Sequence, residues 1–80
     1  MPKPGDYVQI WKRHQAEQEN AYVNGHGRLG YVVKKWSDTV DNQGPIYQVI
    51  CFGSSSPERF NVWYGWLNRI TKSTDIKGRD

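Results

Sequence analysis

Runs of apolar residues that alternate with polar ones predict five short β-strands along this chain. In the first run Val8 and Ile10 lie on one face, because neighbouring strand residues point to opposite faces. Turn residues separate the later runs, and Gly30 inside the second run predicts a bulge or a tight bend. The predicted strands cover residues 7–12, 28–36, 46–52, 58–63 and 66–71.

The segments outside these strands are mostly polar. Residues 13–27 predict a long first loop, closed at the turn dipeptide Asn24 and Gly25, and an irregular hairpin through residues 21–23 is one form it could take. Residues 72–80 contain a single apolar side chain and are expected to form a flexible tail. One domain is therefore expected over residues 1–71.

Residues 62–70 form the densest aromatic stretch of the chain. Three large aromatic side chains surround Gly65, whose backbone freedom permits a tight corner between the fourth and fifth strands. Leu67 and Ile70 follow at a spacing that lets them close the sheet. The aromatic residues of this corner are Trp63, Tyr64 and Trp66.

Eighty residues support one domain with a small core. Five short antiparallel strands without a strong helix predict an all-β fold, a five-stranded antiparallel barrel. No stretch approaches the roughly 18 apolar residues of a membrane helix, and the N-terminus shows no apolar signal region, so a cytoplasmic protein is expected. The expected core residues are Val8, Ile10, Leu29, Val32, Val49, Leu67 and Ile70.

Four segments of the chain resemble those of the SH3-like barrel superfamily. Its members often read PGD-x-V-x-I, G-x-x-G-x-V, Y-x-V-x-F and L-x-x-I in this order, and the resemblance spans roughly residues 4–71. It implies an SH3-like barrel, a fold shared by KOW domains, a stromal photosystem I subunit and many short phage-encoded proteins. The corresponding segments here are residues 4–10, 27–33, 47–52 and 66–70.

In size and layout the chain is most similar to the short phage-encoded members. That similarity implies a phage accessory or structural protein, located in the host cytoplasm or the virion. The first loop is longer and more acidic than a KOW loop, and the fourth strand is richer in tryptophan. The resemblance therefore does not carry over a ribosomal or transcriptional role.

The net charge of +3 and the pI near 9.2 meet a weak criterion for nucleic-acid contact, but the basic residues are spread along the chain. Cys51 is the only cysteine, so an internal disulfide and a cysteine-rich zinc site are excluded. It lies in an apolar run, where we expect a buried, inert thiol that suits a reducing compartment.

Several motifs suggest chemistry but lack its context. Residues 25–30 read G-x-G-x-x-G, yet a strand follows them where a dinucleotide site needs a helix, so we interpret the glycines as turn and bend residues. Residues 54–56 are serines in a turn without a positioned base. The two histidines, His14 and His26, are expected to be solvated loop residues, because their spacing from Asp6, Glu17 and Glu19 fits no zinc pattern.

We therefore expect a protein that is not an enzyme and has no catalytic residue, cofactor or metal. The aromatic side chains are the stronger indication of function. A barrel of this size cannot bury all of them, and exposed aromatic patches usually mark interaction sites. The first hypothesis is a protein-interaction module that docks an unidentified protein partner, with no membrane role. Its partner-binding residues would be Trp11, Trp36, Trp63, Tyr64 and Trp66.

Two alternatives stay open. Trp36 and Trp63 could instead pair across strands and simply cover the barrel. The protein could also be a nucleic-acid-binding barrel in which aromatic rings stack on bases, although Glu17, Glu19, Asp38 and Asp41 argue against a continuous basic groove. The phosphate contacts would then be Lys12, Arg13, Arg28, Lys34, Lys35 and Arg59.

Overall fold

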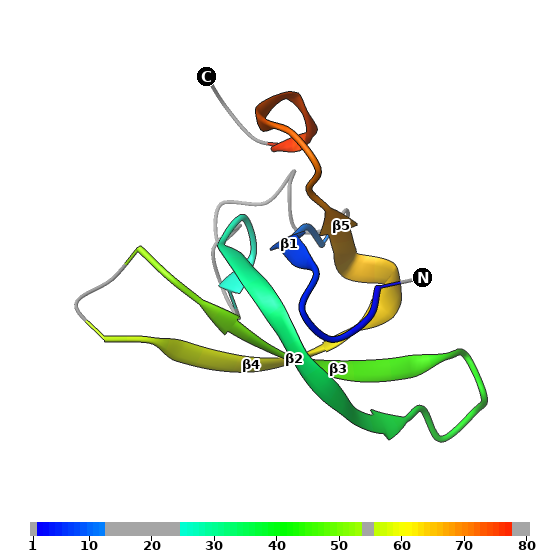
Figure 1. The fold of residues 1–80 in the computed structure, drawn as a ribbon. Coiled ribbons are helices and arrows are strands. Elements are labelled where there is room, and N and C mark those ends of the chain that lie inside the picture. The colour runs from blue at the N-terminus through cyan, green and yellow to red at the C-terminus, as the bar shows by residue number, and fades with distance from the viewer. Residues whose placement is uncertain (1, 13–24, 54–55, 78–80) are drawn as a thin grey trace.

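The structure, a computed structural model, describes residues 2–12, 25–53 and 56–77. It is a single antiparallel sheet of five strands in the order β4-β3-β2-β1-β5. The long strand β2 runs through the molecule, with β1 and β5 near one end and the turn into β3 at the other (Figure 1). The strands are β1 (Tyr7–Ile10), β2 (Leu29–Asp38), β3 (Pro45–Cys51), β4 (Glu58–Trp63) and β5 (Leu67–Arg69).

The predicted all-β class and the five antiparallel strands are confirmed, with strand ends that differ by at most two residues. The predicted corner is a single turn of 3-10 helix, η2 (Tyr64–Trp66), between β4 and β5. Among the described residues no ladder joins β4 to β5, so the sheet is compatible with a small barrel but is not closed into one. The predicted loop at residues 13–24 and its hairpin at residues 21–23 lie outside the described residues.

The core lies on one face of this sheet, because β-strand side chains alternate between faces. Strand β3 shows the alternation directly: every second residue from Pro45 to Cys51 is buried, and the residues between them are half-buried. Four expected core residues are fully buried, but Leu29, Leu67 and Ile70 are only half-buried. The buried hydrophobic set is Val8, Ile10, Val32, Tyr47, Val49, Cys51 and Val62.

Gly30 has a different role from the predicted bulge. The register shifts of β2 fall later, between Val32 and Lys34 and between Lys35 and Ser37. A Cβ atom at Gly30 would lie 2.9 Å from the Cα of Cys51 and would collide with the backbone carbonyl of Ile50. Glycine is therefore needed here for the close approach of β3 rather than for a bend.

The segment after β5 is hydrogen-bonded to the sheet, where the sequence predicted a flexible tail. Thr71 donates hydrogen bonds to the Asp75 carboxylate from its hydroxyl and its backbone N–H, and these bonds hold the pKa of Asp75 below its usual value. Asp75 ends a second 3-10 turn, η3 (Ser73–Asp75). Further along, the Gln9 side chain of β1 pairs with the backbone of Lys77, donating from Nε2 and accepting at Oε1 at 2.6 Å each. The buried Gln9 side-chain amide thus donates one hydrogen bond to the backbone of this segment and accepts another, as the backbone of a neighbouring strand would.

We predict that Gly30→Ala lowers the free energy of unfolding by about 3 kcal/mol or more, because the added methyl group meets backbone that cannot rotate away. Urea denaturation measures the change. Gly5→Ala is the matched control: its φ is 94° and nothing lies within 4 Å of a Cβ there, so only backbone strain of about 1–2 kcal/mol is expected. Equal losses in the two variants would contradict the close-approach explanation.

Candidate functional site

The aromatic residues of the predicted corner pack on one another and on the turn between β2 and β3. The ring centroids of Trp63 lie 5.2 Å from Tyr64 and 5.8 Å from Trp66, both in edge-to-face geometry. The Trp63 indole N–H donates a hydrogen bond of 2.9 Å to the backbone oxygen of Gln43. Tyr64 and Trp66 pack against the core, and because all three aromatic side chains are half-buried, only part of each ring is left for a partner.

Trp11 and Lys12 follow β1 and contact a buried histidine. The Lys12 backbone N–H donates to Nδ1 of His26 at 2.8 Å, and the Trp11 and His26 ring centroids are 4.6 Å apart. The Lys12 ammonium lies 4.8 Å from the centroid of the Trp66 ring, a cation–π contact that joins this group to the corner. The expectation that His26 is solvated is wrong, because this ring is 2% exposed. His14 lies outside the described residues.

Burial and a neighbouring cation determine the protonation of this group. Burial lowers the pKa of His26, and the nearby charge of Lys12 lowers it further. Burial also lowers the pKa of Lys12. The neutral imidazole accepts a hydrogen bond at Nδ1, which a doubly protonated ring cannot do. His26 therefore works as a structural acceptor that attaches the segment before β2 to the end of β1.

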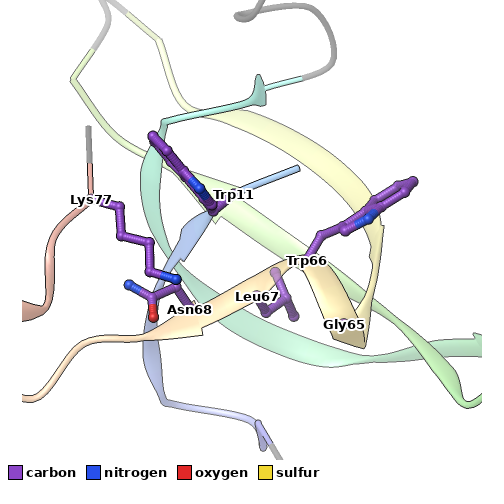
Figure 2. A pocket seen from close by; sticks show the side chains of 6 residues that line it. All are labelled: Trp11, Gly65, Trp66, Leu67, Asn68 and Lys77. Atoms are coloured by element: carbon purple, nitrogen blue, oxygen red, sulfur yellow. The ribbon is translucent and has the colours of Figure 1, made fainter. Parts of the chain in front are cut away.

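An open pocket lies beside this group, where the ends of β1 and β5 meet (Figure 2). The Trp11 and Trp66 indoles stand on either side of it, Leu67 lies between them, and the Lys77 side chain reaches toward Asn68 (Figure 2). The backbone holds the two tryptophans in place, because the Trp11 N–H donates to the Trp66 carbonyl at 2.7 Å. We call this feature the Trp11–Trp66 pocket; it is lined by Trp11, Gly65, Trp66, Leu67, Asn68 and Lys77.

Trp36 is the one predicted partner-binding residue that the structure places apart from the others. It lies in β2 at the second register shift and is 53% exposed. Among the described residues it has no ring partner, so Trp36 and Trp63 do not form the cross-strand pair that was one alternative. The other four predicted residues lie around η2 and the end of β1.

The candidate phosphate contacts are in different environments. Lys12 is buried, Arg28 forms an ion pair of 2.7 Å with Glu58, and Lys35 lies 2.9 Å from Asp38. Lys34 and Arg59 are exposed, and neither has an ion-pair partner among the described residues. Arg13 lies outside the described residues. Two of the six candidates are thus left as accessible cations in the described part of the chain.

The sequence reasoning missed a second aromatic group on the other face of the sheet from the core. Tyr7, Tyr31 and Phe52 have ring centroids 6.4–6.5 Å apart in all three pairs and are 61%, 37% and 45% exposed. Because side chains alternate along β1 and β2, Tyr7 and Tyr31 were already expected on the face of the sheet that Val8 and Val32 do not share. The sequence pattern did not indicate that Phe52 lies beside these tyrosines, because the position of Phe52 depends on the register of β3 against β2. We call these three residues the aromatic face.

The described side chains do not assemble a catalytic group. Cys51 is fully buried, and burial raises the pKa of its thiol, which disfavours the reactive thiolate. Ser54 and Ser55 lie outside the described residues, while Ser56 is exposed in the turn before β4. Among the residues that the structure describes, no three His, Cys, Asp or Glu side chains lie close enough to hold a metal ion. Gly25 and Gly27 lie in a turn that leads into β2, as the sequence indicated, whereas Gly30 lies inside β2.

Comparison with known proteins matches the chain to no family model, no curated protein and no solved structure. Within the described residues no helix has the length and apolar character needed to span a membrane. The functional argument therefore depends on the geometry of the Trp11–Trp66 pocket and the aromatic face.

We predict that the protein loses stability as the pH falls from about 6.5 toward 5. The unfolded His26 binds a proton below its ordinary pKa of about 6.5, whereas the folded imidazole stays neutral until the pH reaches its lowered pKa. Stability is therefore complete above pH 6.5 and declines between the two pKa values. Urea denaturation at several pH values between 5 and 8 measures this slope.

His26→Asn should flatten this slope, because asparagine can accept the same hydrogen bond but does not titrate. His14→Asn is the matched control and should keep the wild-type slope. A wild-type profile with no slope between pH 5 and 6.5 would show that His26 is not held in its neutral form.

Proposed function

We propose that this protein is a non-catalytic protein-interaction module built on an SH3-like barrel. The strand order and the 3-10 turn between β4 and β5 support that architecture. From the resemblance of the sequence to short phage-encoded members of the superfamily, we propose a phage accessory or structural protein that acts in the host cytoplasm or the virion. The observation that carries the proposal is the Trp11–Trp66 pocket, which sets two indoles around an opening between two strand ends.

The lining of the pocket defines the chemistry of its partner. The accessible lining of the pocket is mostly polar, and the half-buried indoles and Leu67 add a small apolar part that a partner's aliphatic or aromatic side chain would cover. At the opposite side, the Lys77 ammonium and the Asn68 amide can contact a carboxylate or a carbonyl oxygen. This lining contains no nucleophile paired with a base, so it suits binding rather than catalysis.

The predicted residues divide into two roles under this proposal. Trp11 and Trp66 contact the partner directly, whereas Trp63 and Tyr64 hold η2 in place behind them. Trp36 lies near the end of β2 that leads into the turn before β3, and it is not part of the pocket lining. A partner segment with an apolar side chain next to an acidic residue would satisfy both sides of the pocket.

A selection from a random peptide library displayed on a carrier tests the proposal. We expect enriched peptides that combine an aliphatic or aromatic residue with a neighbouring carboxylate. Trp11→Ala should weaken their binding by about 30-fold, the effect of removing a central interface residue, and Lys77→Glu should weaken it by about tenfold. Binding is measured by fluorescence anisotropy.

Lys72→Glu is the matched control, because Lys72 is exposed and lies outside the pocket lining. The Lys72→Glu variant should bind the selected peptides within about twofold of the Lys3→Glu variant. Both variants carry the same change of charge. Near-ultraviolet circular dichroism checks that each variant is folded. Peptides that bind the Trp11→Ala and Lys77→Glu variants as tightly as wild type would overturn the assignment of the pocket.

A further inference from the structure

The second surface with functional character is the face of the sheet that points away from the core. Strand pairing places Tyr7 opposite Tyr31, Tyr31 opposite Ile50, and Ile50 opposite Arg59. Directly paired residues share a face, so these side chains form one row across four strands. Phe52 joins the row from the end of β3, where its N–H donates to the Leu29 carbonyl at 3.0 Å.

The three rings of the aromatic face are held by strands and remain accessible. The rings of Tyr31 and Phe52 are near-parallel at 27°, whereas Tyr7 meets Tyr31 at 71° and Phe52 at 65°. Each ring is more than one-third exposed, in contrast to the half-buried tryptophans of the corner. Rings positioned by a sheet need little further ordering before they contact a ligand, which lowers the entropic cost of binding.

The charged residues at the paired strand positions of this face are both basic. The next paired row contains Lys34, Gln48 and Asn61, so the accessible cations Lys34 and Arg59 share a face with the rings. The paired positions on this face include no Asp or Glu. They are Tyr7, Gln9, Leu29, Tyr31, Lys34, Ser37, Ile46, Gln48, Ile50, Arg59, Asn61, Trp63 and Asn68.

Of the four acidic residues that argued against nucleic acid, Asp38 and Asp41 lie elsewhere, and Glu17 and Glu19 lie outside the described residues. Asp38 is paired with Lys35, and Asp41 lies in the turn between β2 and β3, beyond the last paired residues of both strands. Glu58 is paired with Arg28 and lies opposite Cys51, on the core side of the ladder. The objection drawn from the sequence therefore does not apply to the aromatic face, as far as the described residues extend.

We propose that the aromatic face binds single-stranded nucleic acid, with bases stacked on Tyr7, Tyr31 and Phe52 and phosphates contacted by Lys34 and Arg59. Accessible rings beside unpaired cations are the combination that single strands require, because every base has a stackable face and every nucleotide carries a negative charge. A duplex hides its base faces and is not the expected ligand. An acidic peptide matches the charge but does not need three rings.

The rings and cations of this proposal are not part of the lining of the Trp11–Trp66 pocket, so the two proposals can fail independently. Tyr7, Gln9 and Trp11 follow one another on the same side of β1, and Gln9 is covered by its two hydrogen bonds to Lys77. The docked segment after β5 thus stands between the aromatic face and the pocket. Changes at Tyr31 or Arg59 do not touch the lining of the pocket.

The test is fluorescence anisotropy of the whole protein with a labelled oligothymidine of about 15 nucleotides, at several salt concentrations. We expect micromolar binding at about 50 mM salt, and two phosphate contacts predict a slope of about −1.4 for log K against log salt. Arg59→Gln or Lys34→Gln should each reduce that slope by about 0.7. Lys72→Gln, an exposed lysine outside this face, should leave the slope unchanged.

Stacking is tested by variants that keep the apolar character but change the ring. Tyr31→Phe keeps the ring and should bind within about twofold of wild type, whereas Tyr31→Leu should bind about tenfold or more weakly. Thermal unfolding confirms that both variants are folded. Equal affinity of the Leu and Phe variants would overturn the stacking role. Binding of a duplex or of a poly-glutamate peptide as tight as that of oligothymidine would overturn the assignment to single strands.

Discussion

The short strand β1 is the constraint on which the rest of this structure depends. It is hydrogen-bonded to β2 on one side and to β5 on the other, so it joins the start of the chain to its end. Its inward residues Val8 and Ile10 are fully buried and anchor the core. Its outward residues contribute in turn to the aromatic face, to the docking of the last segment and to the pocket. One alternating strand therefore positions every candidate surface of the molecule.

The aromatic residues serve two different purposes in so small a domain. Around η2, tryptophan rings pack edge-to-face over a core that contains few aliphatic side chains. On the face that points away from the core, Tyr7, Tyr31 and Phe52 pack on one another and stay accessible to solvent. A small core cannot bury all of this aromatic surface. The exposed aromatic rings lie together on the strands or directly after them, which fixes their positions. This arrangement favours a role in binding in addition to any role in stability.

The distribution of charge becomes clear only after the ion pairs are assigned. A net charge of +3 spread along eighty residues gives no basic patch in the sequence. In the fold, carboxylates neutralise Arg28 and Lys35, and burial removes Lys12 from the surface. Lys34 and Arg59 remain as exposed cations on the same face of the sheet as Tyr7, Tyr31 and Phe52. The same composition therefore supports a pocket between two indoles at one surface and a cationic, ring-bearing surface at another.

The sequence by itself determined the all-β class, the five strands and the corner at Gly65, because these follow from local alternation and turn residues. It also determined that Cys51 is buried and that Gly25 and Gly27 make a turn. Only the tertiary structure decided which aromatic side chains are exposed, that His26 is a buried acceptor, and that Gln9 binds the segment at Lys77. Those outcomes depend on strand register and on contacts between residues far apart in the chain, and local pattern contains no information about either.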